Sequence, residues 1–274
     1  FPGPRIQDLP THLLPGGPAD PHARRRLIFI GDIHGCLSEL RHLLHTLDFH
    51  PATDHLIPVG DVISKGPHSP AVLDALLARN ATPVRGNHEA RILALPHHRG
   101  SRPDRRLRHH LSPAHLAALH AMPLILRIPP LPRAPPASPL SFPLLVVHAG
   151  LVPGLPLARQ TPYFVVNMRS IRPHSCQPLV AAADKHHRSR PWHQLWDRFN
   201  RRALRRWRKS DAAVDSVHAP HVVVYGHHAK AGLRINTWSK GLDSGCVRGG
   251  QLSALVLDAH ARERVVQVEC PDRR

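Results

Sequence analysis

The strongest constraint on this chain is a series of short apolar segments that each end in glycine followed by Asp or Asn. Three occur early and end at Asp32, Asp61 and Asn87. Leucines at helical spacing lie between them, in residues 37–47 and 69–79. This β-α-β-α-β order predicts an α/β fold, in which functional residues gather in loops beyond the carboxyl ends of strands.

The second half of the chain continues the pattern. Residues 144–150 (LLVVHAG) and 221–228 (HVVVYGHH) each run from an apolar segment into glycine and histidine. Residues 252–258 and 264–269 read as a closing hairpin of two strands. The sequence therefore predicts five strand ends that carry polar, metal-binding residue types.

We expect one folded domain over residues 25–270. Residues 1–24 contain proline and glycine without apolar periodicity and end in a basic run, which favours a flexible arm or docking segment. Residues 129–143 hold seven prolines and predict an extended loop. Residues 153–220 read as an insertion that contains one amphipathic basic helix around residues 192–207.

Cysteine spacing and hydropathy give weak expectations about the compartment. The four cysteines form neither a Cys-x-x-Cys pair nor a cluster with metal-ligand spacing, which favours a reducing environment. No stretch approaches the roughly 18 apolar residues of a membrane span. The chain begins with Phe1, so we expect a longer precursor. We therefore expect a cytoplasmic monomer, with vacuolar or other targeting left open.

The charge balance is strongly basic. Lys and Arg number 37 against 19 Asp and Glu, a net charge of +18. Compositional bias of the source genome explains this excess, and so does a polyanionic substrate such as nucleic acid or polyphosphate. A hydrophobic content of 42% excludes a wholly disordered chain, and four cysteines exclude a disulfide-dense scaffold.

The residues at the strand ends form a candidate metal cluster. Their side chains supply carboxylate, imidazole and amide donors, which suit Mn, Fe or Zn better than soft copper or hard calcium. Two ions need one shared carboxylate and two or three further ligands each, and this set supplies them. The candidates are Asp32, His34, Asp61, Asn87, His88, His148 and His227. A single histidine after a strand is more often structural, so the prediction depends on their ordered occurrence.

Together these motifs resemble a known family. GDIHG, GDVISKG, GNHE, HAG and GH, in that order, resemble the phosphoprotein phosphatase (PPP) family of metallophosphoesterases over about residues 27–269. HAGLVPG, NMRSI and KGLDSGCVRGGQLSAL are similar to its ApaH-like branch, related to bacterial diadenosine tetraphosphatase. The resemblance implies a calcineurin-like fold, which is a central β-sandwich flanked by helices with a two-metal site at the strand-end loops.

The resemblance also implies roles for individual residues. It implies two divalent metal ions (Mn, Zn, Fe or Co), a hydroxide nucleophile that bridges them, and His88 as the general acid that protonates the leaving oxygen. Asp32 and His34 would bind the first ion, Asp61 would bridge both, and Asn87, His148 and His227 would complete the second.

The chain departs from the family pattern where GDxVDRG is expected. Ser64 replaces the Asp that usually orients the catalytic histidine, and Lys65 replaces an Arg that contacts phosphate. Lysine keeps the charge but loses the planar fork of the guanidinium group, so we expect Lys65 to bind phosphate as a point charge. The group that orients His88 is left open between Ser64 itself, a water and another carboxylate.

A second phosphate contact is expected from an arginine. Arg169, in NMRS, aligns with the Met-Arg segment of the ApaH-like branch. Arg172 and Arg85 are rival candidates. His228 stands where the branch commonly has Asp, so we expect it to be only a neighbour of the site.

The function implied is metal-dependent hydrolysis of phosphoester or phosphoanhydride bonds. The anionic substrates associated with the ApaH-like branch are nucleotide polyphosphates, capped RNA and inorganic polyphosphate. Two alternatives stand beside it, a protein serine/threonine phosphatase and a catalytically impaired polyanion-binding module that has kept the fold.

Overall fold

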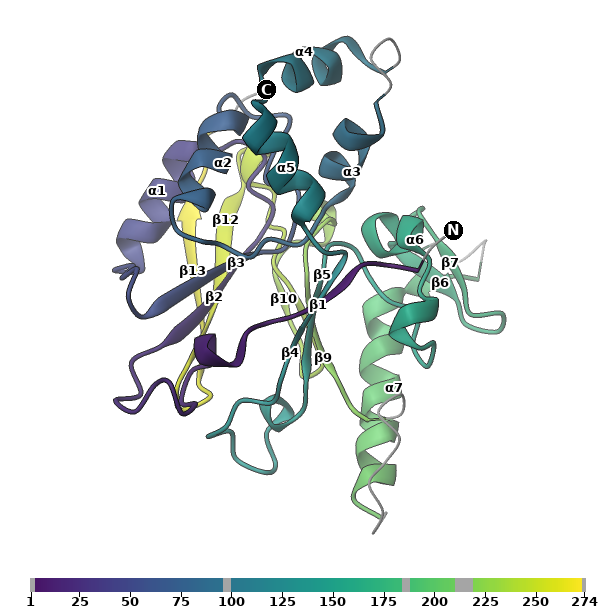
Figure 1. Ribbon diagram of the computed structural model, residues 1–274. Helices are drawn as coiled ribbons and strands as arrows, with labels where there is room; N and C mark the ends of the chain where they lie inside the picture. Colours follow the sequence, from purple (N-terminus) through teal and green to yellow (C-terminus); the bar gives the residue numbers. More distant parts are fainter. Residues whose placement is uncertain (1–2, 96–99, 184–187, 210–218, 273–274) are drawn as a thin grey trace.

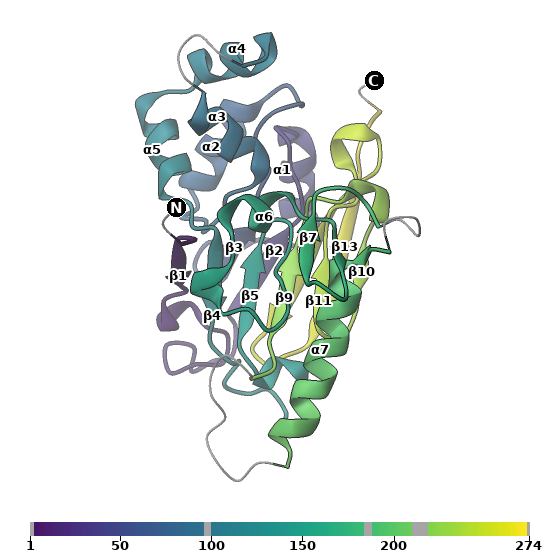
Figure 2. The same cartoon turned by 90° about the vertical axis from the view of Figure 1, so that its right-hand side faces the viewer.

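Two β-sheets packed face to face form the centre of the molecule, with helices on their outer sides (Figures 1 and 2). The computed structural model describes residues 3–95, 100–183, 188–209 and 219–272. This β-sandwich flanked by helices is the predicted fold, and the prediction is confirmed. Among the described residues, none of the helices has the length and apolar content needed to cross a bilayer.

The first sheet has four strands in the order β13-β12-β2-β3. β2 and β3 are parallel and are joined through helix α1 (Leu37–Thr46), while β12 pairs antiparallel with both β2 and β13. The strands are β2 (Arg26–Ile30), β3 (Asp54–Pro58), β12 (Gln251–Asp258) and β13 (Glu263–Glu269). The hairpin expected near the end of the chain is thus β12–β13.

The second sheet has six strands in the order β1-β4-β5-β9-β11-β10. They are β1 (Ile6–Asp8), β4 (Ile125–Ile128), β5 (Leu144–Val147), β9 (Val222–Tyr225), β10 (Arg234–Ile235) and β11 (Ser239–Gly241). β5 and β9 are parallel neighbours, so the loops that follow them lie at the same edge of the sheet.

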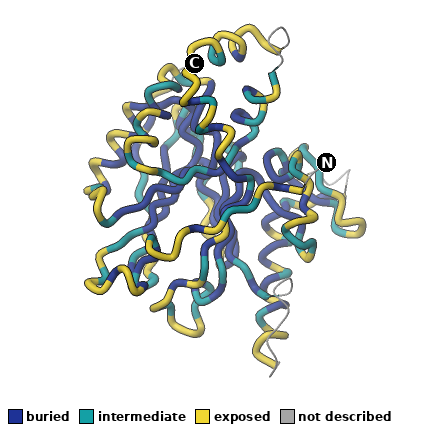
Figure 3. Tube along the Cα trace, viewed as in Figure 1, coloured by how far each residue is buried: buried dark blue, intermediate teal, exposed yellow. Residues whose placement is uncertain are grey.

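Alternating side chains of the strands build two cores. Leu27 and Phe29 of β2 face the second sheet, while Ile28 and Ile30 face α1 and helix α2 (Ser69–Leu77). All four side chains are fully buried, and Figure 3 shows the strands of both sheets as the most buried part of the chain. A strand buried on both faces explains why residues 27–30 read as a continuous apolar run.

The remaining helices cover the edges and ends of the sandwich. They are α3 (Asn87–Ala94), α4 (Arg102–His110), α5 (Pro113–Ala121), α6 (Pro162–Asn167) and α7 (Trp192–Trp207). Single 3₁₀ turns are η1 (Thr11–Leu13), η2 (Pro139–Ser141), η3 (Leu157–Arg159), η4 (Ala229–Ala231) and η5 (Cys246–Arg248). Apart from η2, residues 129–143 contain no helix or strand, as the prolines predict.

The segment 153–220 contains the predicted basic helix, α7, and also a small third sheet. Its strands are β6 (Ser170–Arg172), β7 (Gln177–Leu179) and β8 (Arg190–Pro191), with β6 in the middle. This sheet lies beside α6 on the outer face of the second sheet in Figure 2. Residues 184–187 and 210–218 of the segment lie outside the described residues.

The beginning of the chain differs from the expected flexible arm. β1 pairs in parallel with β4 at the edge of the second sheet, and Leu9 and Leu14 are buried in the core between the sheets. Asp8 accepts two hydrogen bonds from Arg127 on β4. The flexible-arm reading was wrong and the docking reading agrees with this pairing, because three residues at a sheet edge and two isolated leucines leave no periodic pattern in the sequence.

The strand expected just before Asn87 is not a regular β-strand in the structure. Residues 82–84 run alongside β3, with the Thr82 and Val84 amides donating to the Leu56 and Pro58 carbonyls. Pro83 between them has no N–H group, which prevents a continuous ladder on its other side. The chain still delivers Asn87 to the sheet edge, so the consequence for the site is unchanged.

Two cysteines pair, contrary to the expectation from their spacing. Cys246 in η5 and Cys270 just after β13 form a disulfide, with Cα atoms 5.1 Å apart. The β12–β13 hairpin returns the chain to η5 and so brings together residues that are 24 positions apart. Pairing through a hairpin follows from the fold and not from local spacing.

Burial of His55 predicts a loss of stability in acid. Burial lowers the pKa of His55 on β3 to about 4 from 6.5, with His12 and Arg25 adding to the shift. Between these pH values the unfolded chain binds more protons than the folded one, so stability falls as pH drops. Replacing His55 by Gln should lessen the fall in unfolding free energy from pH 7 to 4, by about 2–3 kcal/mol at most.

Urea denaturation of His55→Gln and wild type at pH 7, 5.5 and 4 measures this difference. His42→Gln, on the exposed side of α1, is the matched control and should follow wild type. Equal acid losses in wild type and His55→Gln would show that another group causes the acid sensitivity.

Candidate active site

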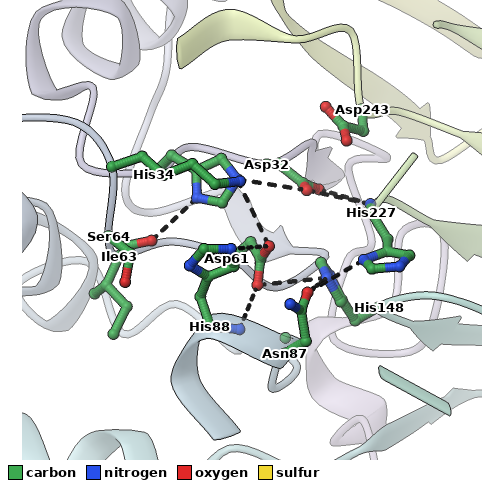
Figure 4. Close-up of polar contacts among 12 residues, drawn as sticks. Asp32, His34, Asp61, Ile63, Ser64, Asn87, His88, His148, His227 and Asp243 are labelled. Atoms are coloured by element: carbon green, nitrogen blue, oxygen red, sulfur yellow. Dashed lines mark hydrogen bonds and ion pairs between the residues drawn. The ribbon is translucent and has the colours of Figure 1, made fainter. Parts of the chain in front are cut away.

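The loops after β2, β3, β5 and β9 and the start of α3 converge at one edge of the sandwich (Figure 4). They bring together all seven residues that the sequence suggested as a cluster: Asp32, His34, Asp61, Asn87, His88, His148 and His227. All except Asn87 are buried side chains. The convergence arises because parallel neighbours within each sheet place their carboxyl ends side by side, and the two sheets pack face to face.

Asp61 lies at the centre of the cluster. His148 Nε2 is 3.4 Å from Asp61 Oδ1, while His34 Nε2 and His88 Nε2 are 3.6 and 3.8 Å from Oδ2. Asp32 Oδ2 lies 4.0 Å from the same nitrogen of His34. One carboxylate thus faces imidazoles on both sides, which is the geometry that a bridging ligand needs.

Asn87 occupies the side of the cluster away from His34. Its Oδ1 lies 2.9 Å from His148 Nε2 and 3.1 Å from His227 Nδ1. The backbone N–H of His227 donates to both oxygens of Asp32 at 3.1 and 3.2 Å. The two halves of the predicted ligand set are therefore joined through His148 and His227.

Three histidines are oriented as metal ligands usually are. His34 Nδ1, His148 Nδ1 and His227 Nε2 lie 3.1, 2.9 and 3.1 Å from backbone carbonyl oxygens of Ile63, Val59 and Asn167. A carbonyl oxygen can only accept a hydrogen bond, so in each neutral ring the nitrogen that contacts the carbonyl carries the proton. The second ring nitrogen then directs its lone pair into the cluster. Ligating histidines commonly donate their second N–H to such a partner.

This arrangement leaves lone pairs facing one another. The lone pair of His148 Nε2 points at Asn87 Oδ1 and at the Asp61 carboxylate, which are also acceptors. Burial acts to lower the pKa of His148, but Asp61 outweighs it and raises the pKa to about 10. Burial likewise opposes ionisation of Asp61, yet His148 holds the pKa of that carboxyl well below its usual range. Without a bound cation the proton on His148 supplies the positive charge that these acceptors need, and a divalent ion at the same place would supply it instead.

A second position in the cluster is occupied by an ammonium group. Lys65 Nζ lies 2.7 Å from His34 Nε2, in front of Asp61 and Asp32. Burial lowers the pKa of Lys65, although the nearby carboxylates oppose that shift. The residues around His34 thus accept a cation, and the donor set fits a metal ion at this position too.

Asp243 is a further carboxylate at the site that sequence reasoning did not assign. Burial, followed by the charge of Asp243, raises the pKa of Asp32 well above its usual value, and Asp32 in turn hydrogen bonds Asp243. Asp243 follows β11 in the segment LDSG, so its position at the end of a strand was a usable signal.

Glu89, the last residue of GNHE, is a second residue that was missed. It is fully buried and accepts hydrogen bonds from the backbone N–H groups of Asp61, Ile63 and Gly86 at 2.9, 3.2 and 2.8 Å. Burial raises its pKa to about 7. Glu89 therefore fixes the loop of Asp61 to the start of α3.

Backbone strain is concentrated in the same loops. His34, Asp61, Ser64, Lys65 and His227 have φ values of 48°, 50°, 72°, 65° and 71°. Residues other than glycine rarely adopt this left-handed backbone conformation. Such strain persists where surrounding contacts fix it, commonly at functional sites.

A cavity of about 360 Å³ opens over the cluster, and cations line it. They are Lys65, Arg169, Lys230 and Arg248. Arg169 donates to the Val180 carbonyl at 3.1 Å, and burial lowers its pKa. The rival Arg172 instead contacts the exposed Gln177, and Arg85 bonds the His120 carbonyl. Of the three arginines, only Arg169 lines the cavity; His228 lines it as well.

The His88 ring contacts a residue that sequence reasoning did not consider. Arg91 Nη2 lies 3.0 Å from His88 Nδ1 and 2.8 Å from Asp104 Oδ1. Ser64 Oγ is buried and has no hydrogen-bond partner in the described part of the chain. Burial, with Lys65, His34 and Arg91, lowers the pKa of His88 to about 3. The hydrogen-bond partner of the His88 imidazole is thus the cationic side chain of Arg91, which in turn bonds the carboxylate of Asp104.

Comparison with known proteins identifies relatives of the whole domain. The model of the calcineurin-like phosphoesterase family matches residues 25–244. The symmetrical bis(5'-nucleosyl)-tetraphosphatase of Janthinobacterium sp. (strain Marseille) is 30% identical over 89% of this chain and 96% of that protein. The enzyme of the same name from Edwardsiella ictaluri (strain 93-146) is 47% identical over 25% of each chain. Several such relatives match over only about a quarter of their length.

Solved structures show the same architecture. The crystal structure of a candidate diadenosine tetraphosphatase superimposes with a TM-score of 0.71, at 28% identity, over 97% of this chain and 98% of that one. A protein serine/threonine phosphatase from Saccharomyces cerevisiae has a TM-score of 0.56 at 13% identity, covering 100% of this chain and 85% of that one. The second likeness concerns the fold alone.

Proposed function

This chain belongs to the calcineurin-like phosphoesterase family, and we propose that it is a metal-dependent hydrolase of phosphoanhydride or phosphoester bonds in polyphosphorylated substrates. The observation that carries the proposal is the set of three histidines whose second ring nitrogens are directed into the cluster by backbone carbonyls, His34 and His148 toward Asp61 and His227 toward Asn87. Histidines that bind metal ions commonly donate their other ring N–H to a partner of this kind.

We propose that this cluster holds two divalent ions. Asp32 and His34 would hold one, Asn87, His148 and His227 the other, and Asp61 both. When bound, such ions supply Lewis-acid activation of the phosphoryl group and of the attacking water. Nitrogen and oxygen donors together favour Mn, Zn, Fe or Co over Ca.

The side chains around the cluster would bind and orient the substrate. Lys65 and Arg169 face the cavity and neutralise phosphoryl oxygens, whose negative charge is spread over the group during transfer. His88 points Nε2 at the same space, where its N–H would donate a hydrogen bond that stabilises charge on the leaving oxygen. Positioning of this kind accounts for much of the catalysis of phosphoryl transfer.

Chain charge and cavity lining favour a substrate with several phosphates. The cavity is lined by more cationic side chains than one phosphate group needs: Lys65, Arg169, Lys230 and Arg248. The relatives above are named as tetraphosphatases of dinucleosides. We therefore propose dinucleoside or nucleotide polyphosphates as the substrate class. Capped RNA and inorganic polyphosphate share the same phosphoanhydride chemistry.

A substrate panel tests the proposal. Purified protein would be stripped of metal, reloaded with Mn²⁺, Zn²⁺ or Co²⁺, and assayed on diadenosine tetraphosphate, capped RNA, polyphosphate and a phosphoserine peptide. Turnover of the polyphosphates that vanishes with chelator supports it. Preference for the phosphopeptide would favour a protein phosphatase, and metal binding without any turnover would indicate a binding module.

Arg169 and Arg172 provide a matched pair for the phosphate contact. Replacing Arg169 by Ala should lower kcat/KM by about tenfold to a hundredfold, since a charge-assisted hydrogen bond contributes about 1.5–3 kcal/mol. Arg172→Ala should have little effect, because Arg172 contacts exposed Gln177. Steady-state kinetics on diadenosine tetraphosphate distinguishes them, and a larger loss in Arg172→Ala would reverse the assignment.

A further inference from the structure

We propose that Arg91, held by Asp104, is the positioning residue for His88, in a chain that has Ser64 where the family has an orienting Asp. This inference rests on the proposed function, because it concerns how His88 meets the substrate. The contact is direct, with Arg91 Nη2 lying 3.0 Å from His88 Nδ1.

The arrangement follows from the position of both residues in α3. His88 lies in the first turn of the helix and Arg91 is three residues later, so their side chains share one face. The Nη2 amino group has two hydrogens, and the structure gives each a partner, His88 Nδ1 and Asp104 Oδ1. The guanidinium group is therefore fixed from one side while it contacts the imidazole on the other.

Asp104 is itself held by the start of α4. Ser101 caps that helix, accepting a hydrogen bond from the Asp104 amide, and its hydroxyl donates to Asp104 Oδ2 at 2.6 Å. The Asp104 side chain is 9% exposed, which makes its orientation well defined. Thus α4, which carries no predicted site residue, reaches His88 through a chain of three contacts.

A guanidinium partner has a chemical consequence that a carboxylate partner does not have. Arginine has no acceptor, so Nδ1 of His88 must accept the hydrogen bond. In the neutral ring the single proton then resides on Nε2, the nitrogen that faces Asp61 at 3.8 Å. A carboxylate at Nδ1 would instead require the proton on Nδ1. Arg91 therefore presents an N–H to the substrate without dependence on Ser64, whose hydroxyl has no partner in the described residues.

A kinetic cycle tests this role. Arg91→Met removes the hydrogen-bond donors of the guanidinium group while keeping the apolar stem. Arg91→Lys retains a single cationic nitrogen that can donate. With Mn²⁺-loaded enzyme, Arg91→Met should lower kcat on phenyl phosphate by about tenfold to a hundredfold, but affect p-nitrophenyl phosphate much less, because the better leaving group needs less help. KM and metal content should stay unchanged, and Arg91→Lys should recover part of the loss.

Two comparisons separate positioning from a structural effect. In a His88→Ala background, Arg91→Met should cause no further loss on phenyl phosphate, since contacting residues that act together are not additive. Asp104→Asn should produce the same pattern more weakly, whereas Arg102→Ala, exposed on α4, should match wild type. Additive losses, or equal losses on both esters, would overturn the role of Arg91.

Nitrogen NMR of protein labelled with ¹⁵N-histidine tests the contact without any activity. The His88 signals are identified by their loss in His88→Ala, and in metal-free wild type they should report a proton on Nε2 only. Arg91→Met should shift this toward a mixture of tautomers, and a protonated Nδ1 in wild type would refute the inference. If the His88 proton is on Nε2 as expected but no substrate is turned over, the proposed function is refuted and the Arg91 contact is not.

Discussion

Replacing Asp61 by Asn is expected to abolish most of the hydrolytic activity, lowering kcat by about a thousandfold or more, because several kcal/mol of metal-dependent stabilisation are lost. Asn keeps the size of the side chain but removes the charge that three histidines face at 3.4, 3.6 and 3.8 Å. The remaining neutral ligands would bind divalent ions weakly, so metal content should fall together with the rate.

The same change should not unfold the protein. In the absence of metal, loss of the Asp61 charge removes the group that raises the pKa of His148, so His148 becomes neutral and needs no counter-charge. Metal content by plasma mass spectrometry, kcat, and thermal unfolding of the apoprotein are the readouts. Asp48→Asn, at an exposed turn residue with φ of 47° that Asn tolerates, is the control. Full activity in Asp61→Asn would exclude Asp61 as a shared ligand.

The sequence was most informative where local pattern and topology coincide. Asp32, Asp61, His148 and His227 each follow a strand. Parallel pairing brings together Asp32 with Asp61 in one sheet and His148 with His227 in the other, and the packing of the two sheets joins the pairs. Helix α7 was predicted at about its observed bounds, because apolar and basic positions alternate with helical spacing from Trp192 to Trp207.

Features that depend on distant parts of the chain were not predictable. β1 is stable only because β4, more than a hundred residues later, offers its edge. The Cys246–Cys270 disulfide depends on the β12–β13 hairpin, and Arg91 depends on α4, whose Asp104 has no motif to mark it. Ser64 alone indicated that something must replace the usual carboxylate, but side-chain orientation within α3 was needed to identify the replacement.

His88→Ala is the second change with a large expected effect. It should lower the rate of hydrolysis without loss of bound metal. Loss of one donor that stabilises developing charge costs about a hundredfold to a thousandfold, so kcat on diadenosine tetraphosphate should fall within that range. His88 Nε2 is 3.8 Å from Asp61, but its Nδ1 contacts Arg91. Within the described residues no backbone carbonyl bonds this ring, unlike the rings of the proposed ligands His34, His148 and His227. Metal content should therefore remain near that of wild type.

The combination of lost rate and retained metal distinguishes His88 from the proposed ligands. His148→Ala should lose both, because His148 Nε2 lies between Asp61 and Asn87. His45→Ala, exposed at the end of α1, should lose neither. If His88→Ala lost metal to the same extent as His148→Ala, His88 would be a ligand and the leaving oxygen would need another donor. Lys65, 2.7 Å from His34, would then be the first residue to test in that role, because its ammonium group is already in the cluster.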